Sequence, residues 1–233
     1  MNICVIPARG GSKRIPRKNI KEFNGKPIIA YSIEAALKSN CFSQVIVSTD
    51  DDEISEVAKK YGALVPFVRP DELSNDYAGT IPVIKHAIEW MEDNNNYIEN
   101  VCCLYATAPF IQSKIISKAY QQLQDSNSDY CFSVTSFAFP IQRAIKIVQG
   151  NKVDMLYPEH FNTRSQDLEE AYHDAGQFYW GKAQAFKDEL PLFSEVATPY
   201  ILPRYLVQDI DTMEDWIRAE AMYKVLQETE ALL

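Results

Sequence analysis

The sequence predicts an α/β fold in which a mainly parallel β-sheet is covered by helices on both faces, a three-layer α/β/α arrangement. Short apolar segments rich in β-branched residues alternate with segments of helical periodicity, as in repeated β-α-β units. Turn residues bound these apolar segments, which indicates buried strands. With 233 residues, 46% hydrophobic and 24% charged, the chain is expected to form one soluble domain over residues 1–233.

The predicted elements follow one another in a regular order. Strands are expected at residues 3–6, 44–49, 63–68, 101–105, 130–136, 176–180 and 199–202. Helices are expected at residues 27–39, 53–61, 80–91, 113–123 and 212–228. Pro27 suits a first helical turn, and Gly62 suits the end of the second helix. Because ligands of such sheets bind at the carboxyl ends of the strands, the loops after Ile6, Thr49 and Tyr105 are expected to share one edge.

The segment 137–172 departs from this alternation. Helical periodicity is weak there, and Phe, Tyr, Pro and Arg are frequent. We interpret it as a β-rich excursion from the sheet. The pattern leaves open whether the excursion is an arm that mediates a dimer or a lid over the site.

Composition narrows the class of partner and the compartment. The formal net charge of −9 disfavours general nucleic-acid binding, which needs a basic face. No apolar run approaches the ~20 residues of a membrane span, and Met1 leads directly into a strand and a charged loop, so we expect neither a membrane segment nor a signal peptide. The five cysteines form no Cys-x-x-Cys pair, which is typical of reduced thiols in a cytoplasmic protein.

A cationic loop follows the first strand. Seven of the chain's 23 Lys and Arg residues lie between Arg9 and Lys26, with Glu22 as the one acid among them. Gly10 and Gly11 allow close approach of a ligand, and successive N–H groups in such a loop can bind an anion. The spacing is neither that of a Walker A loop nor Gly-x-Gly-x-x-Gly. The loop is therefore either an ordinary solvated turn or a phosphate site outside those two motifs.

An acidic pair precedes the last helix. In extended backbone, Asp209 and Asp211 would project to the same side and repel each other unless a cation or proton lies between them. Carboxylates together with substrate phosphates are ligands that Mg²⁺ prefers. The alternative is that Asp211 only caps the helix. Together with the cationic loop, the pair suggests transfer of a nucleotidyl group, with the triphosphate held by the loop and pyrophosphate as the leaving group.

Several motifs match one family in order along nearly the whole chain. They are PARGGSK at residues 7–13, PRKN at 16–19, VSTD at 47–50, RPxxL at 69–73 and DID at 209–211. Together they resemble the CMP-sialic acid synthetase family, cytidylyltransferases that activate nine-carbon 2-keto-3-deoxy sugar acids with CTP and Mg²⁺. The resemblance implies a nucleotide-sugar transferase fold (Rossmann-like), usually dimeric, and hence a homodimer.

The resemblance also assigns roles to individual residues. It implies that Arg9, Lys13 and Lys18 hold the triphosphate and stabilise the leaving pyrophosphate. It implies an Mg²⁺ site at Asp209 and Asp211, with Asp209 also orienting or deprotonating the anomeric hydroxyl. The remaining nucleotide contacts that it implies are Ala8, Gly10, Ser12, Asn19, Arg69 and Thr80.

The sugar side departs from the sialic acid enzymes. Those enzymes carry Gln in a Gln-Pro-Thr-Ser-Pro-Leu-Arg motif, where this chain has Tyr105 in YATAPF, and they commonly have Gly in place of Arg14. YATAPF and the DAGQFYW motif at 174–180 resemble instead the pseudaminic acid branch, whose products serve surface-glycan or flagellin glycosylation. Tyr105 and Tyr179 are candidate walls for the sugar, unless they only pack in the core.

Three polar residues are candidates for further contacts with the sugar acid. Arg143 and Arg164 match the geometry of a carboxylate, although such arginines are often ordinary surface residues. Gln177 is a candidate for a hydrogen bond to an N-acyl carbonyl. Other readings are a cytidylyltransferase for sialic, legionaminic or octulosonic acid, a glycosyltransferase on a similar fold, or a regulator that binds nucleotide without turnover.

Overall fold

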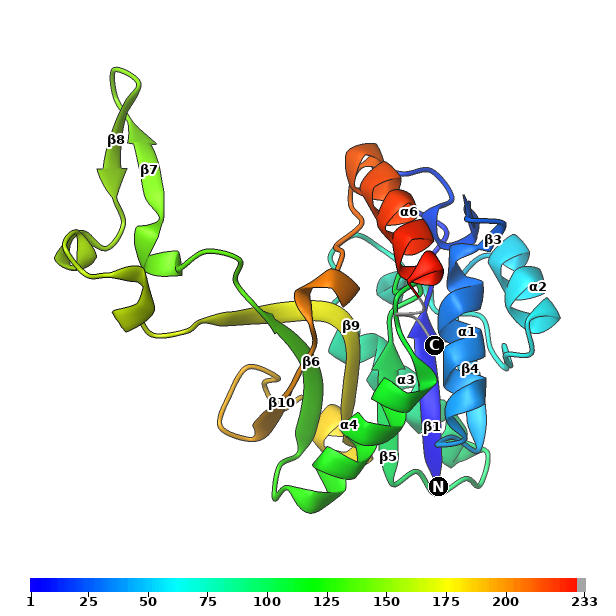
Figure 1. Ribbon diagram of the computed structural model, residues 1–233. Coiled ribbons are helices and arrows are strands. Elements are labelled where there is room, and N and C mark those ends of the chain that lie inside the picture. Colours follow the sequence, from blue (N-terminus) through cyan, green and yellow to red (C-terminus); the bar gives the residue numbers. More distant parts are fainter. Residues whose placement is uncertain (230–233) are drawn as a thin grey trace.

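Six strands form the central sheet, in the order β10-β6-β9-β5-β1-β4 (Figure 1). The structure is a computed structural model, and it describes residues 1–229. The strands are β1 (Asn2–Pro7), β4 (Gln44–Ser48), β5 (Asn100–Leu104), β6 (Tyr130–Ser136), β9 (Tyr172–Lys182) and β10 (Ala197–Ile201). β1 pairs in parallel with β4 and β5, and β10 with β6, while β9 runs antiparallel to both of its neighbours. The predicted mainly parallel sheet is confirmed.

Helices cover both faces of this sheet. One core cluster contains residues of α1 (Ile28–Ser39), α2 (Asp52–Lys60), α4 (Ser113–Asp125) and α6 (Met213–Glu228). The other contains residues of α3 (Thr80–Asp93) and α5 (Ala183–Lys187). Alternate side chains of β1 enter the two clusters, Cys4 and Ile6 on one face and Ile3 and Val5 on the other. Burial of residues 3–6 on both faces of β1 explains the continuous apolar sequence there.

The strand expected at residues 63–68 is reduced to a single bridge between Leu64 and Ile46. The N–H of Leu64 donates to Val45 and its carbonyl accepts from Val47, and pairing stops there. Pro66 has no N–H to continue the ladder, and Val68 is exposed. The segment then reaches Thr49, whose carbonyl accepts from the N–H of Arg69, so Arg69 is still delivered to the sheet edge.

Two small hairpins complete the strands. β2 (Glu22–Phe23) pairs with β3 (Lys26–Pro27) after the cationic loop, and β7 (Ile145–Val148) pairs with β8 (Lys152–Met155). Short 3-10 turns lie at Lys18–Ile20, Asp71–Leu73, Ile141–Arg143, Pro158–His160, Ser165–Asp167 and Arg204–Leu206. Among residues 1–229, no helix has both the length and the apolarity to cross a bilayer.

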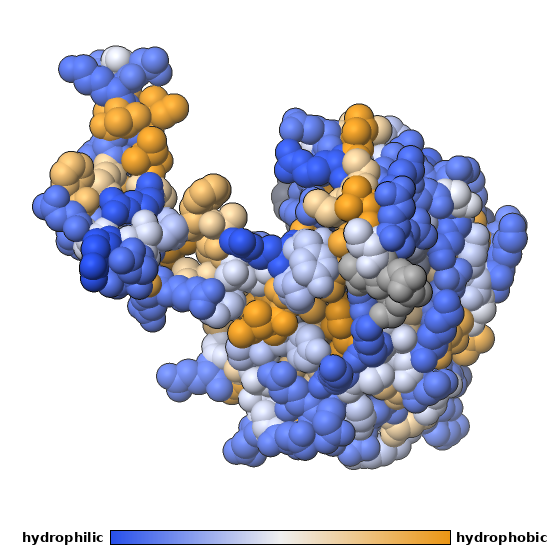
Figure 2. Space-filling model, in the orientation of Figure 1, coloured by the Kyte–Doolittle hydropathy of each residue, from blue (hydrophilic) through white to orange (hydrophobic). Residues whose placement is uncertain are grey.

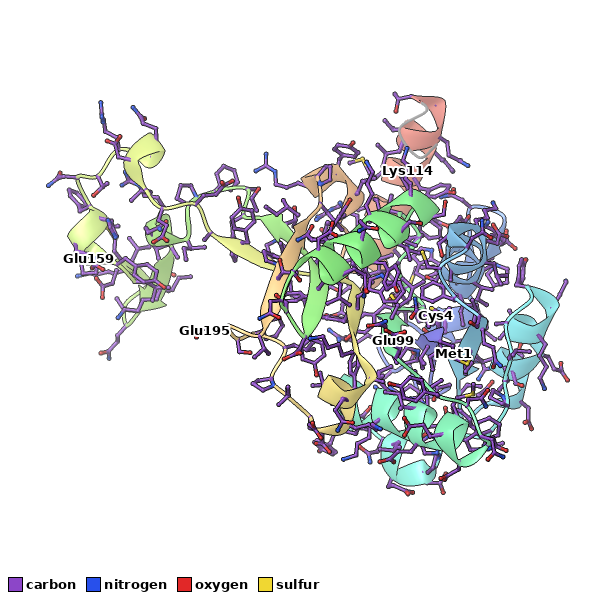
Figure 3. All side chains as sticks on the ribbon, turned by 90° about the horizontal axis from the view of Figure 1, so that it is seen from below. Met1, Cys4, Glu99, Lys114, Glu159 and Glu195 are labelled. Atoms are coloured by element: carbon purple, nitrogen blue, oxygen red, sulfur yellow. The ribbon has the colours of Figure 1, made fainter. Side chains whose placement is uncertain are left out.

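The β7–β8 hairpin belongs to an arm, residues 137–171, that projects from the body of the molecule (Figure 1). Figure 3 shows the same projection from below, with Glu159 far out on the arm and Cys4 in the body. Apolar side chains are exposed along the arm, where Figure 2 shows hydrophobic surface. The most exposed of them are Phe139, Ile147, Val153 and Phe161. Such a concentration of exposed apolar side chains indicates a surface that contacts another molecule.

Candidate active site

Two neighbouring cavities open at the carboxyl edge of the central strands. The first, of about 460 Å³, begins beside Pro7, the last residue of β1, and extends to Tyr105 and Thr107 just after β5. The second, of about 450 Å³, lies against β9 and the chain after α5. Gly79, Thr80 and Tyr105 line both cavities and so form a shared wall. This is the edge at which ligands of open α/β sheets bind.

The first cavity, which we call the cationic cavity, is lined by Arg9, Arg14, Lys18 and Arg69 and by no carboxylate of the described residues. The N-terminus of α3 also borders it at Gly79 and Thr80, without a side-chain cap and without an acid in the first turn. Unpaired N–H groups and the helix dipole add positive potential there. The cavity is therefore suited to a polyanion such as a triphosphate.

Arg69 is the most buried of these cations, with only 4% of its surface exposed. Its guanidinium donates to the Ser48 hydroxyl at 3.1 Å, to the Ser48 carbonyl and, at 3.5 Å, to the Leu73 carbonyl. Burial lowers the pKa of Arg69 to about 10. The side chain therefore stays positive at neutral pH, and a bound anion would be attracted more strongly than by an exposed arginine.

The cationic loop takes its shape from internal contacts. Asn19 donates to the carbonyl of Arg9 at 2.9 Å and is 8% exposed. A Cβ on Gly10 would lie 2.7 Å from the Asp51 carboxylate, so a larger residue there would displace Asp51, and Gly10 has no positive φ. The Gly10 N–H donates to Asp50 at 2.9 Å. Ser12 lines the cavity, whereas buried Ala8 only supports it, through an N–H bond to Ser48.

The cationic loop and the acidic pair meet. Lys18 donates through Nζ to the carbonyl of Ile210 at 2.7 Å and to Asp211 Oδ1 at 3.4 Å. Arg14 lies 2.9 Å from Asp211 Oδ2. Asp209 and Asp211 lie in an irregular segment just before α6. The N-terminus of α6 is capped by Thr212 together with Asp215, so Thr212, and not Asp211, is the capping residue. One edge of the sheet thus carries both the phosphate-binding charges and the acids.

The carboxylate of Asp209 is perturbed by its surroundings. Partial desolvation, reinforced by the charge of Asp211, raises its pKa. A divalent cation between the two carboxylates would relieve that repulsion. Residues 1–229 contain no group of three or more His, Cys, Asp or Glu that would hold a metal by itself. Two carboxylates completed by substrate phosphates and water fit Mg²⁺, which keeps several non-protein ligands.

Asp76, in the loop before α3, forms ion pairs with two cations of the cationic loop. Its carboxylate lies 2.6 Å from Arg9 and also accepts from Lys13. These contacts lower the pKa of Asp76, chiefly through the bond from Lys13. A phosphate group entering the cavity would compete with Asp76 for the same donors.

The second cavity, which we call the apolar cavity, has a different character. Its wall includes Ile81, Pro82, Leu192 and Phe193. The polar groups in it are few: Thr80, Tyr105, Asp174, Tyr179 and Glu189. The Thr80 and Tyr105 hydroxyls are hydrogen-bonded at 2.9 Å, and burial raises the pKa of Tyr105. An apolar wall with a few convergent polar groups is typical of a small-molecule site.

Eight candidate residues line neither cavity. Ala8 and Gly10 belong to the cationic loop, and Asp209 and Asp211 lie beside its Lys18 and Arg14, whereas the other four are held elsewhere. Gln177 is 3% exposed and donates to the Leu206 carbonyl at 2.5 Å, so its amide is turned away from the apolar cavity. Arg143 donates to carbonyls within the arm, and Arg164 pairs with Asp167 there at 2.6 Å. Lys13 contacts Asp76 but does not line the cationic cavity. Within one chain, Gln177, Arg143 and Arg164 do not line the apolar cavity, and their contacts with a sugar acid stay predictions.

Two residues outside the sequence-based candidates enter the site. Arg14 lines the cationic cavity and pairs with Asp211. It could have been predicted, because it lies in the same run of cations as Arg9 and Lys18. Asp174 enters the apolar cavity from β9 and accepts from Tyr179 at 2.5 Å. Asp174 is the first residue of the DAGQFYW motif, but the motif did not single it out, because its contact with Tyr179 depends on an irregularity of β9 that only the paired sheet reveals.

Replacing Asp76 by Asn is expected to strengthen binding of inorganic triphosphate. Arg9 and Lys13 would no longer be neutralised by a carboxylate in the free protein. Because an exposed ion pair contributes little free energy, the affinity is expected to rise only about two- to tenfold at low salt. Isothermal titration calorimetry measures it. Asp71→Asn is the matched control, an exposed acid in the 3-10 turn just before that loop, with no salt bridge among the described residues. Equal affinities for Asp76→Asn and the unchanged protein would contradict the competition.

The chain is similar throughout its length to proteins of one class. Residues 3–228 match the family described as cytidylyltransferase. A pseudaminic acid cytidylyltransferase of Campylobacter jejuni is 50% identical over 98% of both chains. A CMP-N,N'-diacetyllegionaminic acid synthase of Legionella pneumophila is 33% identical over 97% of both.

A solved structure supports the fold independently. A CMP:2-keto-3-deoxy-manno-octonic acid synthetase in complex with CTP superposes with a TM-score of 0.69, at 18% identity, over 96% of this chain and 98% of the other. At that identity the likeness concerns the fold alone. The family match and the high identity to curated relatives carry the assignment: this chain belongs to the cytidylyltransferase family.

Proposed function

We propose that this protein transfers CMP from CTP to the anomeric hydroxyl of pseudaminic acid, giving CMP-pseudaminic acid and pyrophosphate. The observation that carries the proposal is the pair of cavities joined at one wall, one cationic and one mostly apolar, with Asp209 and Asp211 beside the cationic loop. Such a site can hold a triphosphate and a sugar acid side by side. The 50% identity to a pseudaminic acid cytidylyltransferase supports the same substrates.

Transfer of CMP requires mainly that the reactants are positioned and that the negative charge on the leaving pyrophosphate is stabilised. The anomeric oxygen forms a bond to the α-phosphorus of CTP, the bond from that phosphorus to the β-phosphate oxygen breaks, and the electron pair leaves with pyrophosphate. Arg9, Lys18 and Arg69 would hold the triphosphate and stabilise the negative charge that grows on the leaving group. Fixed cations in a partly buried cavity are more effective than the same charges in water.

Asp209 is the group that we assign to the proton of the attacking hydroxyl. Its carboxylate lies beside the cations of the loop, where it can accept that proton, and in the absence of metal desolvation and the charge of Asp211 raise its pKa. Lys18 bonds to Ile210 and Asp211 and so holds the acidic segment at the edge of the cationic cavity. Mg²⁺ held by Asp209 and Asp211 would supply further neutralisation of phosphate charge.

The apolar cavity suits a sugar that carries methyl and acyl groups. Pro82, Leu192 and Phe193 offer apolar contact, and Thr80, Tyr105 and Asp174 offer a few hydrogen bonds. A fully hydroxylated sugar would leave more of its polar groups unpaired against such a wall. This supports pseudaminic acid over a more polar sugar acid.

We further infer a homodimer formed through the arm, acting in the cytoplasm on the route to a surface glycan or glycosylated flagellin. Exposed aliphatic residues on both strands of the β7–β8 hairpin support association with a second copy. Five free cysteines, four of them buried, are consistent with a reducing compartment, where CTP is also available.

The substrate assignment is tested by incubating the enzyme with CTP, Mg²⁺ and one sugar acid at a time, and measuring pyrophosphate release. Pseudaminic acid is expected to give the highest kcat/KM, because its methyl and acyl groups fill the apolar cavity. Legionaminic, sialic and octulosonic acids serve as comparisons. Preference for one of these would reject pseudaminic acid but keep the reaction. Absence of pyrophosphate with every acid, or release of a nucleoside diphosphate from a nucleotide-sugar donor, would reject the reaction itself.

The metal site is tested by Asp209→Asn and Asp211→Asn. Each change removes one of the two charges that would attract Mg²⁺, so the Mg²⁺ concentration for half-maximal rate is expected to rise about tenfold or more. Glu214→Gln is the control, because Glu214 is exposed in the adjacent first turn of α6 and pairs only with Arg218 among the described residues. An unchanged Mg²⁺ requirement in both Asp variants would place the metal elsewhere.

The arm is tested by Ile147→Lys combined with Val153→Lys. These residues pair across the hairpin and are 75% and 65% exposed, so the charges should not disturb the fold but should oppose burial against a second copy. Light scattering is expected to show a shift from dimer to monomer. Lys146→Ala on the same hairpin is the control and should remain dimeric. A monomeric starting protein, or a variant that stays dimeric, would contradict this role of the arm.

A further inference from the structure

The turn just before Lys18 has a backbone conformation that its residue type disfavours. Arg17 adopts a φ of +56° and a ψ of +30°, in the left-handed region, where a residue with a Cβ is strained and Gly is not. Arg17 belongs to the PRKN motif, but it lines neither cavity, whereas Lys18 and Asn19 of the same motif line the cationic cavity. A strained residue beside a binding site is a candidate for a role in that site.

Contacts of the Arg17 side chain offset the strain. The guanidinium donates through Nη1 to Asp51 Oδ2 at 2.5 Å and through Nη2 to Asp51 Oδ1 at 2.8 Å, and Nη2 also donates to Glu53. The bond to Asp51 raises the pKa of Arg17 and lowers that of Asp51. Bidentate pairing of Arg with a carboxylate fixes direction as well as distance. A Gly at this position would keep the turn but lose the bond.

Asp51 is itself held in place by α2 and by the cationic loop. It is the N-cap of α2, and its Oδ1 also accepts from the N–H of Ile54 at 2.9 Å. Its carboxylate lies against Gly10, in space that a Cβ would occupy. The preceding residue, Asp50, accepts from the Gly10 N–H at 2.9 Å. The turn between β4 and α2 therefore holds the cationic loop at two points, Gly10 and Arg17.

The turn at Arg17 also leads to the acidic segment. The Arg17 carbonyl accepts from the N–H groups of Ile20 and Lys21, at 3.0 Å each, and so begins the 3-10 turn that follows. Lys18, the first residue of that turn, bonds to the Ile210 carbonyl at 2.7 Å. Two adjacent cations thus bond near the starts of two different helices, Arg17 at α2 and Lys18 just before α6.

We propose that Arg17 is a positioning residue, whose bond to Asp51 fixes the turn from which Lys18 reaches the acidic segment. This rests on the proposed function, in that the cationic cavity is taken as the triphosphate site. Asn19 donates to the Arg9 carbonyl at 2.9 Å, so a shift of the turn would move Arg9 as well. The Arg17–Asp51 bond, which we call the clamp, thereby keeps the cations that hold the triphosphate at a fixed place relative to the acidic pair.

Asp51→Asn separates the clamp from simple charge, because the two predict changes of opposite sign. Loss of a negative charge near the cavity would by itself tighten the binding of an anion. Loss of the clamp weakens it, because the Asn amide faces Arg17 Nη1 as donor against donor and the loop spends less time in its binding geometry. The Kd of inorganic triphosphate, measured by isothermal titration calorimetry, is expected to rise about three- to tenfold. An unchanged or lower Kd would overturn the proposal.

Asp52→Asn is the matched control. It removes a charge from the next position, an exposed residue in the first turn of α2 with no salt bridge among the described residues. The Kd of inorganic triphosphate is expected to stay within about twofold or to fall. A rise as large as that of Asp51→Asn would overturn the clamp.

Asp51→Asn is expected to fold, because Asn is as good an N-cap as Asp. If it does not, Arg17→Lys replaces it, since this change keeps the charge and removes the bidentate bond. The Kd of inorganic triphosphate is then expected to rise by about threefold or more. An unchanged Kd in Arg17→Lys would overturn the clamp.

The clamp also predicts that its two partners are coupled. Arg17→Gly removes the side chain and keeps the left-handed turn without strain. No clamp is left to break in that background, so Asp51→Asn is expected to leave the Kd of inorganic triphosphate unchanged or to lower it. A further rise as large as in the unchanged protein would show that Asp51 acts by another route, and would overturn the clamp.

Hydrogen exchange in the free protein separates this proposal from the proposed function. With amides resolved by NMR, Asp51→Asn is expected to speed exchange at least about fivefold at Ile20 and Lys21, which donate to the Arg17 carbonyl. The amide of Ile54, which residue 51 caps, is expected to stay within about twofold. Unchanged exchange at Ile20 and Lys21 would overturn the clamp whatever the enzyme acts on. Failure of every sugar acid to react with CTP would overturn the proposed function while the exchange result still stands.

Discussion

The site depends on one contact between the two ends of the sequence. Lys18 Nζ bonds to the Ile210 carbonyl and to Asp211, residues 192 and 193 positions later in the chain. Arg14 adds a second contact to Asp211 at 2.9 Å. These bonds place a segment with no regular secondary structure against the cationic loop, so that the acids lie beside cations that line the cavity instead of on the opposite side of the molecule. Without them, the loop would be an exposed basic turn and the acids would be part of the approach to α6.

Charge distribution within the cavity follows from burial. Arg69 lies inside, held by Ser48 and Leu73 and with no bonded carboxylate among residues 1–229, while Arg9 is closer to solvent and contacts Asp76. The N-terminus of α3 adds its unpaired N–H groups at Gly79 and Thr80. The net charge of −9 disfavours non-specific binding to nucleic acid, while the local positive potential of the cavity attracts a small anionic ligand.

The sugar side is organised by β9, the strand that runs against both of its neighbours. Because it is antiparallel, its irregular portion lies at the same edge as the carboxyl ends of β1 and β5 and can place Asp174 and Tyr179 beside Tyr105. The backbone of Gln177 contributes as well, since its carbonyl accepts from the N–H of Tyr105. The cationic cavity is built from loops after parallel strands, whereas the apolar cavity depends on a bulge within a strand.

Much of this architecture was determined by local sequence. Apolar runs and helical periodicity predicted every helix of eight or more residues and every strand of the main sheet, because burial on one or two faces imposes those patterns. The motifs also predicted that Arg9, Lys18, Arg69 and Asp211 would share one edge. Tertiary structure alone decided the rest. Pro66 and the lack of further pairing stopped the strand expected at 63–68, and burial turned Gln177 toward Leu206. The arm held Arg143 and Arg164 with its own groups, and a shift in register, which no periodicity records, aimed Asp174 at Tyr179. The physical reason is the same in each case: a side chain's partner is set by which distant backbone lies beside it, and that depends on pairing and packing rather than on neighbouring residues.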